Sequence, residues 1–258
     1  MTGRIFDLKE MAVHDGPGLR VTVFFKGCPL RCVWCHNPEG LSPEPQLMFR
    51  KAACRHCGLC RRPCGHPECR PFGRCLHICP EGALSVTGEE ITPAALAARL
   101  RRSLPMADGV TFSGGEPLLQ ADFLQAVLDE LEGVPCALET CGWASRETFL
   151  AAARRMKMVY LDIKLADPAL HERYTGVTNA PILQNLAALR ESGIPAVIRT
   201  PLIPGITDTR ENLDAIRALI GDLPWEQLPY NALAGTKYEM LGMEYPYDWL
   251  FASSGEKS

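Results

Sequence analysis

The cysteines of this sequence constrain its fold and chemistry more than any other feature. There are twelve in 258 residues: Cys28, Cys32, Cys35, Cys54, Cys57, Cys60, Cys64, Cys69, Cys75, Cys79, Cys136 and Cys141. The N-terminal residues carry charges where a secretory signal would have an apolar segment, so we expect a cytoplasmic protein. Cytoplasmic thiols stay reduced, which disfavours disulfides. Metal binding or redox chemistry is therefore the predicted use of these cysteines.

Size, charge and hydropathy narrow the class of protein further. No apolar stretch approaches the roughly 18 residues that cross a bilayer, so we expect no membrane segment. The formal net charge of -3 argues against general binding of nucleic acid. With 47% apolar and 22% charged residues, the composition is that of a globular protein. The length fits one domain with a small insert.

Residues 50–80 differ in charge from the rest of the chain. They hold seven basic side chains and one acidic one, a formal +6, so the remaining residues together carry -9. The same segment contains seven cysteines but few large apolar residues, and small units of this kind are usually held together by metal. We therefore predict a metal-binding insert at 48–84, between an N-terminal part at 1–47 and the remainder of the main fold at 85–258.

Outside the insert, predicted strands and helices alternate. Strands are expected near 21–25, 109–112, 136–139, 158–163, 196–199 and 225–229. Helices are expected near 92–104, 121–131, 146–155, 167–174, 179–192 and 209–220. Alternating β and α segments predict an α/β fold with a parallel sheet. Six units are too few for a closed eightfold barrel, so the sheet should be a partial barrel or an open doubly wound sheet, with its chemistry at the strand ends.

Three cysteines, Cys28, Cys32 and Cys35, follow the first of these strands. Their C-x3-C-x2-C spacing lets three thiolates hold one face of an iron–sulfur cube, which leaves the fourth iron without a protein ligand. An open metal position of this kind can bind a substrate directly. The alternative is a zinc site with His36 as the fourth ligand, although a histidine adjacent to Cys35 gives poor ligand geometry.

This triplet, with an aromatic residue before its last cysteine, resembles the signature of radical S-adenosylmethionine (SAM) enzymes. Gly114-Gly115-Glu116-Pro117 resembles the GGEP motif of the same superfamily. Further segments are similar to glycyl-radical enzyme activating enzymes, and they extend over essentially the whole chain: His14–Arg20, Gly27-Cys28, Asn37–Glu39, Asp162–Lys164, Tyr174–Val177, Pro204-Gly205 and Leu228–Tyr230. The resemblance implies a partial (β/α)6 radical SAM barrel.

The resemblance also implies roles for individual residues. Cys28, Cys32 and Cys35 would bind a [4Fe-4S] cluster whose free iron takes the amino and carboxylate groups of SAM. Glu116 would accept a hydrogen bond from that amino group, and Lys164 would lie near the carboxylate. The residues expected to contact SAM are Trp34, His36, Gly114, Gly115, Glu116, Glu139, Asp162, Lys164, Arg199 and Asn212.

Simpler roles are open for several of these side chains. Asp162 and Lys164 could form an ion pair at the mouth of the barrel, and Asn212 could cap local backbone. Glu139-Thr140 stands where some relatives have Asp-Thr, which helps to bind a monovalent cation beside SAM. Glutamate is one methylene longer than aspartate, which puts that cation site in doubt here.

A rigid turn before the first strand resembles the segment with which the family meets its partner protein. The resemblance implies that Asp15, Gly16 and Arg20 contact the glycine-bearing loop of a glycyl-radical enzyme. A plain β-turn is the alternative for this segment.

The insert resembles a bacterial ferredoxin, with Phe72 in place of one cysteine of the second run. In two-cluster ferredoxins the fourth cysteine of one run binds the other cluster. That rule assigns a complete auxiliary cluster to Cys54, Cys57, Cys60 and Cys79. It leaves Cys64, Cys69 and Cys75 at a second site, which could hold a three-iron cluster, take His66 or a water as ligand, or be empty. A zinc ribbon is the alternative for the whole segment.

The predicted function is activation of a glycyl-radical enzyme. A flavodoxin or ferredoxin would reduce the cluster, SAM would be cleaved, and the resulting radical would remove a hydrogen atom from a backbone glycine of the partner. Such chemistry implies an anaerobic setting, and we expect a monomer. The alternatives are a radical SAM enzyme acting on another peptide or small molecule, an iron–sulfur electron-transfer protein, and a zinc-bound interaction module.

Overall fold

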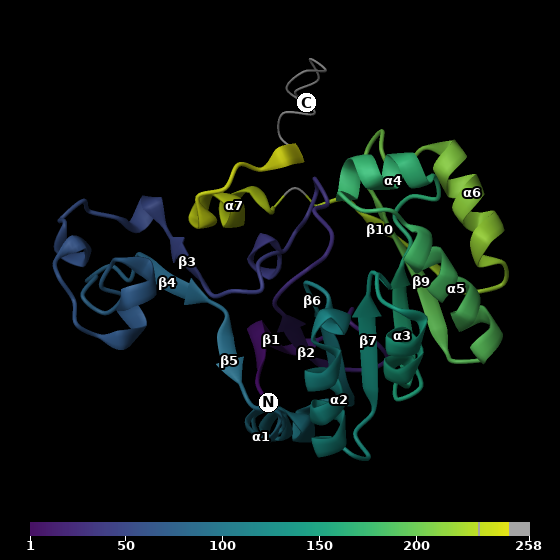
Figure 1. The fold of residues 1–258 in the computed structure, drawn as a ribbon, viewed down its shortest axis with the longest axis horizontal. Helices are drawn as coiled ribbons and strands as arrows, with labels where there is room; N and C mark the ends of the chain where they lie inside the picture. Colours follow the sequence, from purple (N-terminus) through teal and green to yellow (C-terminus); the bar gives the residue numbers. More distant parts are fainter. Residues whose placement is uncertain (232, 248–258) are drawn as a thin grey trace.

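A computed structural model describes residues 1–231 and 233–247 and contains one large sheet. Six of its strands are parallel and follow one another in chain order: β2 (Arg20–Phe25), β6 (Gly109–Gly114), β7 (Cys136–Thr140), β8 (Met158–Asp162), β9 (Ala196–Leu202) and β10 (Trp225–Pro229). Two antiparallel strands, β1 (Gly3–Ala12) and β5 (Glu89–Ile91), extend the edge beyond β2. The sheet is therefore open between β10 and β5, as Figure 1 shows.

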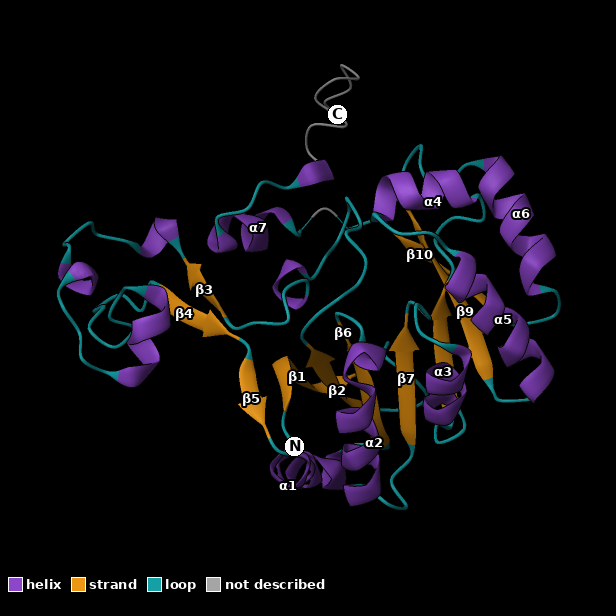
Figure 2. Ribbon diagram, viewed as in Figure 1, coloured by secondary structure: helices purple, strands orange, loops and turns teal. Residues whose placement is uncertain are grey.

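Helices connect the parallel strands and pack on one face of the sheet (Figure 2). They are α1 (Pro93–Ser103), α2 (Ala121–Glu130), α3 (Arg146–Ala153), α5 (Ala180–Ser192) and α6 (Arg210–Ile220), whereas α4 (Pro168–Thr175) lies at the carboxyl ends of the strands. Several begin at side-chain caps: Thr92, Ser145, Asp167 and Thr209 each accept a hydrogen bond from a first-turn N–H. Such caps satisfy N–H groups that the helix itself leaves unpaired.

The strands alternate between an apolar face and a polar face. Val110 and Phe112 of β6 and Leu138 of β7 belong to the main core under the helices. Their neighbours Thr111, Ser113 and Glu139 point to the opposite face, because successive side chains of a strand alternate. Parallel strands are usually apolar on both faces. The polar inner face departs from this pattern and indicates where a site should be sought.

The cysteine-rich segment forms a separate lobe, seen at the left of Figures 1 and 2. Two antiparallel strands, β3 (Gln46–Phe49) and β4 (Leu84–Thr87), form its base. Between them the described chain contains only short 3-10 turns, at Lys51–Ala53, Leu59–Arg61 and Pro67–Phe72. The lobe therefore has little regular backbone structure of its own.

All six predicted parallel strands and the helices between them are confirmed, with boundaries shifted by a few residues. Strands β1 and β5, the β3–β4 pair and α7 (Gly235–Leu241) were not among the elements predicted from the sequence. Strand β1 carries charged residues on its exposed side, which obscured its period. None of the described helices is both long and apolar enough to cross a membrane.

Candidate active site and metal centres

The cysteine triplet lies in a loop that leaves the end of β2. Its backbone is anchored to the end of α4: the N–H of Arg31 donates to the carbonyl of Thr175 at 2.7 Å, and that of Val33 to the carbonyl of Tyr174 at 3.1 Å. Cys32 is buried, while Cys28 and Cys35 are half-buried. The loop is thus fixed by protein contacts before any metal is considered.

A pocket of about 310 Å³ opens at the carboxyl ends of the parallel strands. It brings together the three cysteines and eight of the ten residues predicted to contact SAM. The predicted residues lining it are Cys28, Cys32, Cys35, Trp34, His36, Gly114, Gly115, Glu139, Asp162, Lys164 and Arg199. Residues far apart in sequence therefore meet at one place, as expected for the strand ends of an α/β fold.

Burial alters the acidity of the three thiols. Desolvation raises the pKa of Cys28 and of Cys35, and raises that of Cys32 to about 12, although Lys164 opposes the rise at Cys32 and Cys35. Three thiolates in this setting need a compensating positive charge, which a bound metal centre supplies. The donor set of three sulfurs facing one pocket therefore fits an iron–sulfur cluster with an open iron.

Asp162 and Lys164 form a short ion pair at the end of β8. Lys164 Nζ lies 2.6 Å from Asp162 Oδ2, and the lysine side chain is 10% exposed. Burial alone would lower the pKa of Lys164, but Asp162, Cys32 and Cys141 outweigh it and raise the pKa above its usual range. Lys164 is therefore a permanent cation beside the cysteine triplet.

Arg199 of β9 lies beside Asp162 in the β8–β9 register and organises the neighbouring part of the pocket. Its Nη1 lies 2.5 Å from Glu139 Oε1, and its Nε lies 2.8 Å from Glu226 Oε2. The guanidinium also stacks on Tyr160 at 3.7 Å from the ring centroid. Ser113 donates to the other oxygen of Glu139 at 2.6 Å. Glu139 thus has a fixed cationic partner at the place where the family resemblance puts a monovalent cation.

Glu116 and Asn212 do not line the pocket. Glu116 is fully buried, and its carboxylate accepts from Thr140 Oγ1 at 2.7 Å and from the N–H groups of Cys141 and Leu118 at 2.7 and 3.0 Å. Burial raises the pKa of Glu116, and these hydrogen bonds oppose the rise. In this arrangement the side chain joins the GGEP loop to the end of β7.

Asn212 is held by backbone in the same way. Its Nδ2 donates to the carbonyls of Lys164 and Thr207 at 3.1 and 2.8 Å, and its Oδ1 accepts from the N–H of Ala166 at 2.9 Å. Asn212 therefore fixes the backbone that carries Lys164, which matches the backbone-capping role considered as its alternative.

The two glycines of the GGEP loop are explained first by backbone packing. A Cβ on Gly115 would lie 2.2 Å from the carbonyl oxygen of Gly27 and 2.5 Å from that of Gly40. Gly114 adopts a positive φ of 119°, and a Cβ there would lie 2.3 Å from the N of Phe25. Side chains at these positions would push the loop away from the end of β2, which carries the cysteine triplet.

The residues predicted to meet a partner lie in two different places. Asp15 is on the inner face of the sheet, where Thr111 donates to its carbonyl and Arg199 donates to the carbonyl of the preceding residue, His14. Arg20 instead begins β2. Arg20 is buried, and its Nη2 donates to the carbonyls of Val110 and Pro135 at 2.6 and 2.9 Å. Asp15 is half-buried and accepts from Thr22. In this structure Arg20 ties strand beginnings together and is not at the surface.

Sequence reasoning missed several residues that line the same pocket. Ser113 and Cys141 are among them, whereas Thr140, which also lines the pocket, was already named with Glu139 at the expected cation position. Ser113 had a usable signal, since it alternates with the apolar Phe112 on β6. Cys141 and Cys136 are buried, the usual state of a free cysteine that acts as a small apolar residue.

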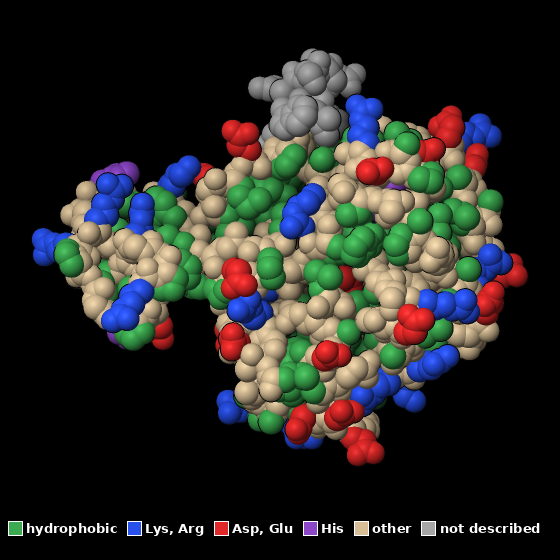
Figure 3. All heavy atoms as spheres, in the orientation of Figure 1, with side chains coloured by type: hydrophobic (Ala, Val, Ile, Leu, Met, Phe, Trp, Pro, Cys, Tyr) green, Lys and Arg blue, Asp and Glu red, His purple; other side chains and the backbone are tan. Residues whose placement is uncertain are grey.

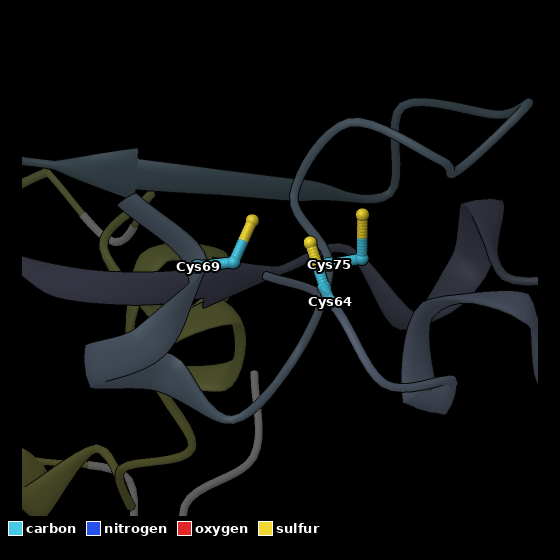
Figure 4. Close-up of side chains that lie close together, drawn as sticks. All are labelled: Cys64, Cys69 and Cys75. Atoms are coloured by element: carbon cyan, nitrogen blue, oxygen red, sulfur yellow. The ribbon is translucent and has the colours of Figure 1, made fainter. Parts of the chain in front are cut away.

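The lobe divides its cysteines into two sets. Cys54, Cys57, Cys60 and Cys79 line one cavity of about 240 Å³. Cys64, Cys69 and Cys75 form a tighter group, with their sulfurs all within 4.8 Å of one another. Figure 4 shows the three side chains pointing to the same side. This partition is the one that the ferredoxin spacing assigns.

Comparison with known proteins places the chain among related sequences. A family model described as the radical SAM superfamily matches residues 22–216. The indoleacetate decarboxylase activating enzyme of Tractidigestivibacter scatoligenes is 36% identical, over 93% of this chain and 87% of that protein. The isethionate sulfite-lyase activating enzyme of Nitratidesulfovibrio vulgaris is 38% identical, over 95% of this chain and 89% of that protein.

Solved structures support the fold. The crystal structure of Streptococcus suis SuiB bound to precursor peptide SuiA has a TM-score of 0.52 and 13% identity, covering 88% of this chain and 43% of that chain. At this identity the likeness concerns the fold alone.

Proposed function

Because the chain belongs to the radical SAM superfamily, and within it to the glycyl-radical enzyme activating enzymes, we propose that its pocket holds SAM against a [4Fe-4S] cluster bound by Cys28, Cys32 and Cys35. The observation that carries the proposal is the pocket itself. One cavity collects the three sulfurs, the two glycines, the Asp162–Lys164 pair and Arg199.

The protein activates a glycyl-radical enzyme. Cys28, Cys32 and Cys35 would hold the cluster, which would supply the single electron needed to cleave SAM, and the hydrogen atom would be taken from a backbone glycine of the partner. The residues of this chain bind, orient and shield the reactants. Trp34 and Leu30 are buried around the triplet, which limits access of water to the cysteine side of the pocket.

The charged side chains of the pocket suit the charges of SAM. Lys164 provides a fixed cation for the carboxylate of the methionine end, in a setting where charge-assisted hydrogen bonds are strong. Asp162 is partly exposed and lies beside it. We assign Glu116 and Asn212 to positioning: Glu116 holds the GGEP loop on β7, and Asn212 holds the backbone of Lys164.

We extend the proposal to the cation site. Arg199 lies beside Glu139 with three further contacts, to Glu226, to the carbonyl of His14 and to the ring of Tyr160. Arg199 thus places a positive charge where some relatives use a monovalent cation, and we infer that this side chain replaces the cation here.

The lobe suits a role in electron delivery. We propose an auxiliary iron–sulfur cluster on Cys54, Cys57, Cys60 and Cys79, in support of which all four line one cavity. Six of the seven basic residues between 50 and 80 are exposed, and Figure 3 shows Lys and Arg side chains spread over this lobe. A basic surface attracts an acidic partner, such as a flavodoxin or ferredoxin. We propose that residues 48–84 form this electron-delivery domain. We also propose that the protein is cytoplasmic and monomeric.

The partner is proposed from the relatives. Their names assign them to an indoleacetate decarboxylase, a choline trimethylamine-lyase and an isethionate sulfite-lyase. We propose a decarboxylase or a C–N or C–S lyase of the glycyl-radical class as partner. Asp15 and Gly16 remain the candidates on this chain for contact with its glycine-bearing loop.

The test is an anaerobic activation assay. The chain is reconstituted with iron and sulfide, then mixed with SAM, dithionite and each of the three glycyl-radical enzymes named above. We expect 5′-deoxyadenosine without any partner, and a glycyl radical in the electron paramagnetic resonance spectrum with a suitable one. Iron incorporation without cleavage of SAM would refute the enzyme assignment. Cleavage with no glycyl radical on any partner would favour another peptide or a small molecule as substrate.

A further inference from the structure

The second cysteine group of the lobe has a geometry of its own. The sulfurs of Cys64, Cys69 and Cys75 all lie within 4.8 Å of one another. In the part of the chain that the structure describes, no other three cysteines come together within that limit. The four cysteines around the 240 Å³ cavity are spaced more widely. The two sets therefore differ in the size of the metal group that they can surround.

The close spacing suits a single ion. Tetrahedral zinc with Zn–S bonds of about 2.3 Å places its sulfur ligands about 3.8 Å apart. In a four-iron cluster each cysteine binds a different iron, so its sulfurs surround an iron–sulfur core and stand farther apart. Three sulfurs that already fall within 4.8 Å leave room for one ion between them rather than for a cluster.

Phe72 cannot provide the fourth ligand that the ferredoxin spacing would place there. Its side chain lines a different cavity, together with Arg4 and Glu44 near the main sheet. That direction gives Phe72 a packing role. The missing ligand must therefore come from elsewhere in the lobe.

Two histidines stand next to Cys69, and neither joins Cys64 or Cys75 within the same limit. His66, Cys69 and His77 form a second group whose ligand atoms lie within 4.8 Å of one another, so Cys69 belongs to both groups. The rings of His66 and His77 are 4.5 Å apart. Glu68 Oε2 lies 3.4 Å from Nε2 of His77 and 3.9 Å from Nδ1 of His66. A carboxylate on one ring nitrogen orients an imidazole so that the other nitrogen can bind metal.

We propose that Cys64, Cys69, Cys75 and His77 bind one Zn²⁺ ion, with Glu68 orienting the imidazole. Cys3His is a common ligand set for structural zinc, and such sites are closed to substrate. The site is separate from the auxiliary cluster. It stands whether or not the protein activates a glycyl-radical enzyme.

The surrounding backbone is arranged for a structural role. Cys69 is almost fully buried, and its sulfur accepts a hydrogen bond from the N–H of Leu76 at 3.3 Å. The N–H of Cys75 donates to the carbonyl of Cys60 at 2.8 Å. The zinc site would thus fix the backbone next to Cys60, one of the ligands proposed for the auxiliary cluster.

The experiment uses the full chain, purified anaerobically with no metal added, and counts zinc and iron per chain. We expect about one zinc per chain. Its extended X-ray absorption fine structure should fit three sulfurs at about 2.3 Å and one nitrogen at about 2.0–2.1 Å. Cys69→Ser should reduce zinc at least fivefold. His77→Cys should keep the zinc and change the fit to four sulfurs, a result that loss of folding cannot produce. His66→Ala is the matched control and should leave the spectrum unchanged.

Several results would overturn the proposal. One is a chain without zinc that takes up about eleven or twelve irons on reconstitution, since that count requires a second cluster in the lobe. Others are zinc that persists at full level in Cys69→Ser, or a nitrogen ligand that disappears in His66→Ala and not in His77→Ala. None of these measurements depends on SAM cleavage. Failure of the zinc proposal can therefore be distinguished from failure of the proposed function.

Discussion

The barrel pocket and the lobe both gather cysteines, but they do so by different means. In the barrel, the loop of Cys28, Cys32 and Cys35 is carried by strand β2 and bonded to the end of α4. In the lobe, seven cysteines lie on 3-10 turns and loops, and Cys69 is the one that is buried among them. The barrel holds its site with a hydrophobic core, whereas the lobe has almost no core to hold one.

The difference teaches where the folding energy of each region comes from. Burial of apolar side chains under the helices can stabilise the barrel without metal. The lobe lacks that contribution, and in such small units metal binding is itself folding free energy. Metal should therefore be a cofactor for the barrel and a structural requirement for the lobe.

Single cysteine substitutions give the largest expected contrast. Cys32→Ala should reduce SAM cleavage to background, because the cluster beside SAM loses a ligand, while the iron of the lobe remains. Cys57→Ala should remove iron from the lobe and leave dithionite-driven SAM cleavage close to that of the unmodified chain. Iron content and 5′-deoxyadenosine are measured for both. Equal loss of SAM cleavage in the two variants would mean that the regions are not independent.

Metal removal should separate the two regions next most strongly. After anaerobic chelation, amides of residues 50–83 should exchange with solvent at least about a hundredfold faster, while amides of β6, β7 and β8 stay protected, because the core keeps its contacts. Hydrogen exchange with mass spectrometry measures both regions in one sample. Protection that persists throughout the lobe without metal would contradict the assignment of its stability to metal.

Lys164 tests the electrostatics of the pocket. Lys164→Met removes the fixed cation proposed for the SAM carboxylate and leaves Asp162 without its partner. A hydrogen bond to a charged group contributes about 1.5–3 kcal/mol, so SAM affinity should fall about 10- to 100-fold. Equilibrium binding of SAM measures the change, with Lys157→Met, on the opposite end of the sheet, as a control. An unchanged affinity for SAM would mean that the Asp162–Lys164 ion pair has a structural role and does not bind SAM.

The basic surface of the lobe gives the smallest expected effect. Arg61→Glu with Arg62→Glu should slow reduction by flavodoxin up to about tenfold at low salt, because the surface no longer attracts an acidic donor. Reduction by dithionite in the same variant should stay constant. Stopped-flow reduction at two salt concentrations measures both. If flavodoxin reduces the variant as fast as the unmodified chain at both salt concentrations, the basic face has no role in donor binding.

The strands and helices of the barrel could be predicted from the sequence more completely than the details of its site. Apolar alternation and helix caps such as Thr92 and Ser145 are local signals, so the six parallel strands and their helices could be predicted. Strand β1 escaped because its edge position leaves one side exposed and charged. Because the carboxyl ends of parallel strands meet at one edge of the sheet, the predicted strands also placed most pocket residues together.

The direction of individual side chains could not be predicted in the same way. Glu116 turns to the N–H of Cys141, a donor that exists only where β7 ends beside the GGEP loop. Arg20 reaches the carbonyl of Pro135, 115 residues away in the sequence. Both contacts depend on tertiary neighbours that no local pattern records. His66 was already a candidate ligand from the sequence, but His77 became one only when the fold placed it beside the sulfur of Cys69.

The paired strands at the base of the lobe have a further consequence. Phe49 and Leu84 are opposite each other in the β3–β4 register, and neighbouring strands stand about 4.8 Å apart. The whole lobe is thus, in topology, the loop of a β-hairpin. A two-residue turn could close the same hairpin. The lobe can therefore be gained, lost or exchanged without cutting a strand of the main sheet, which makes it, in topology, a detachable module.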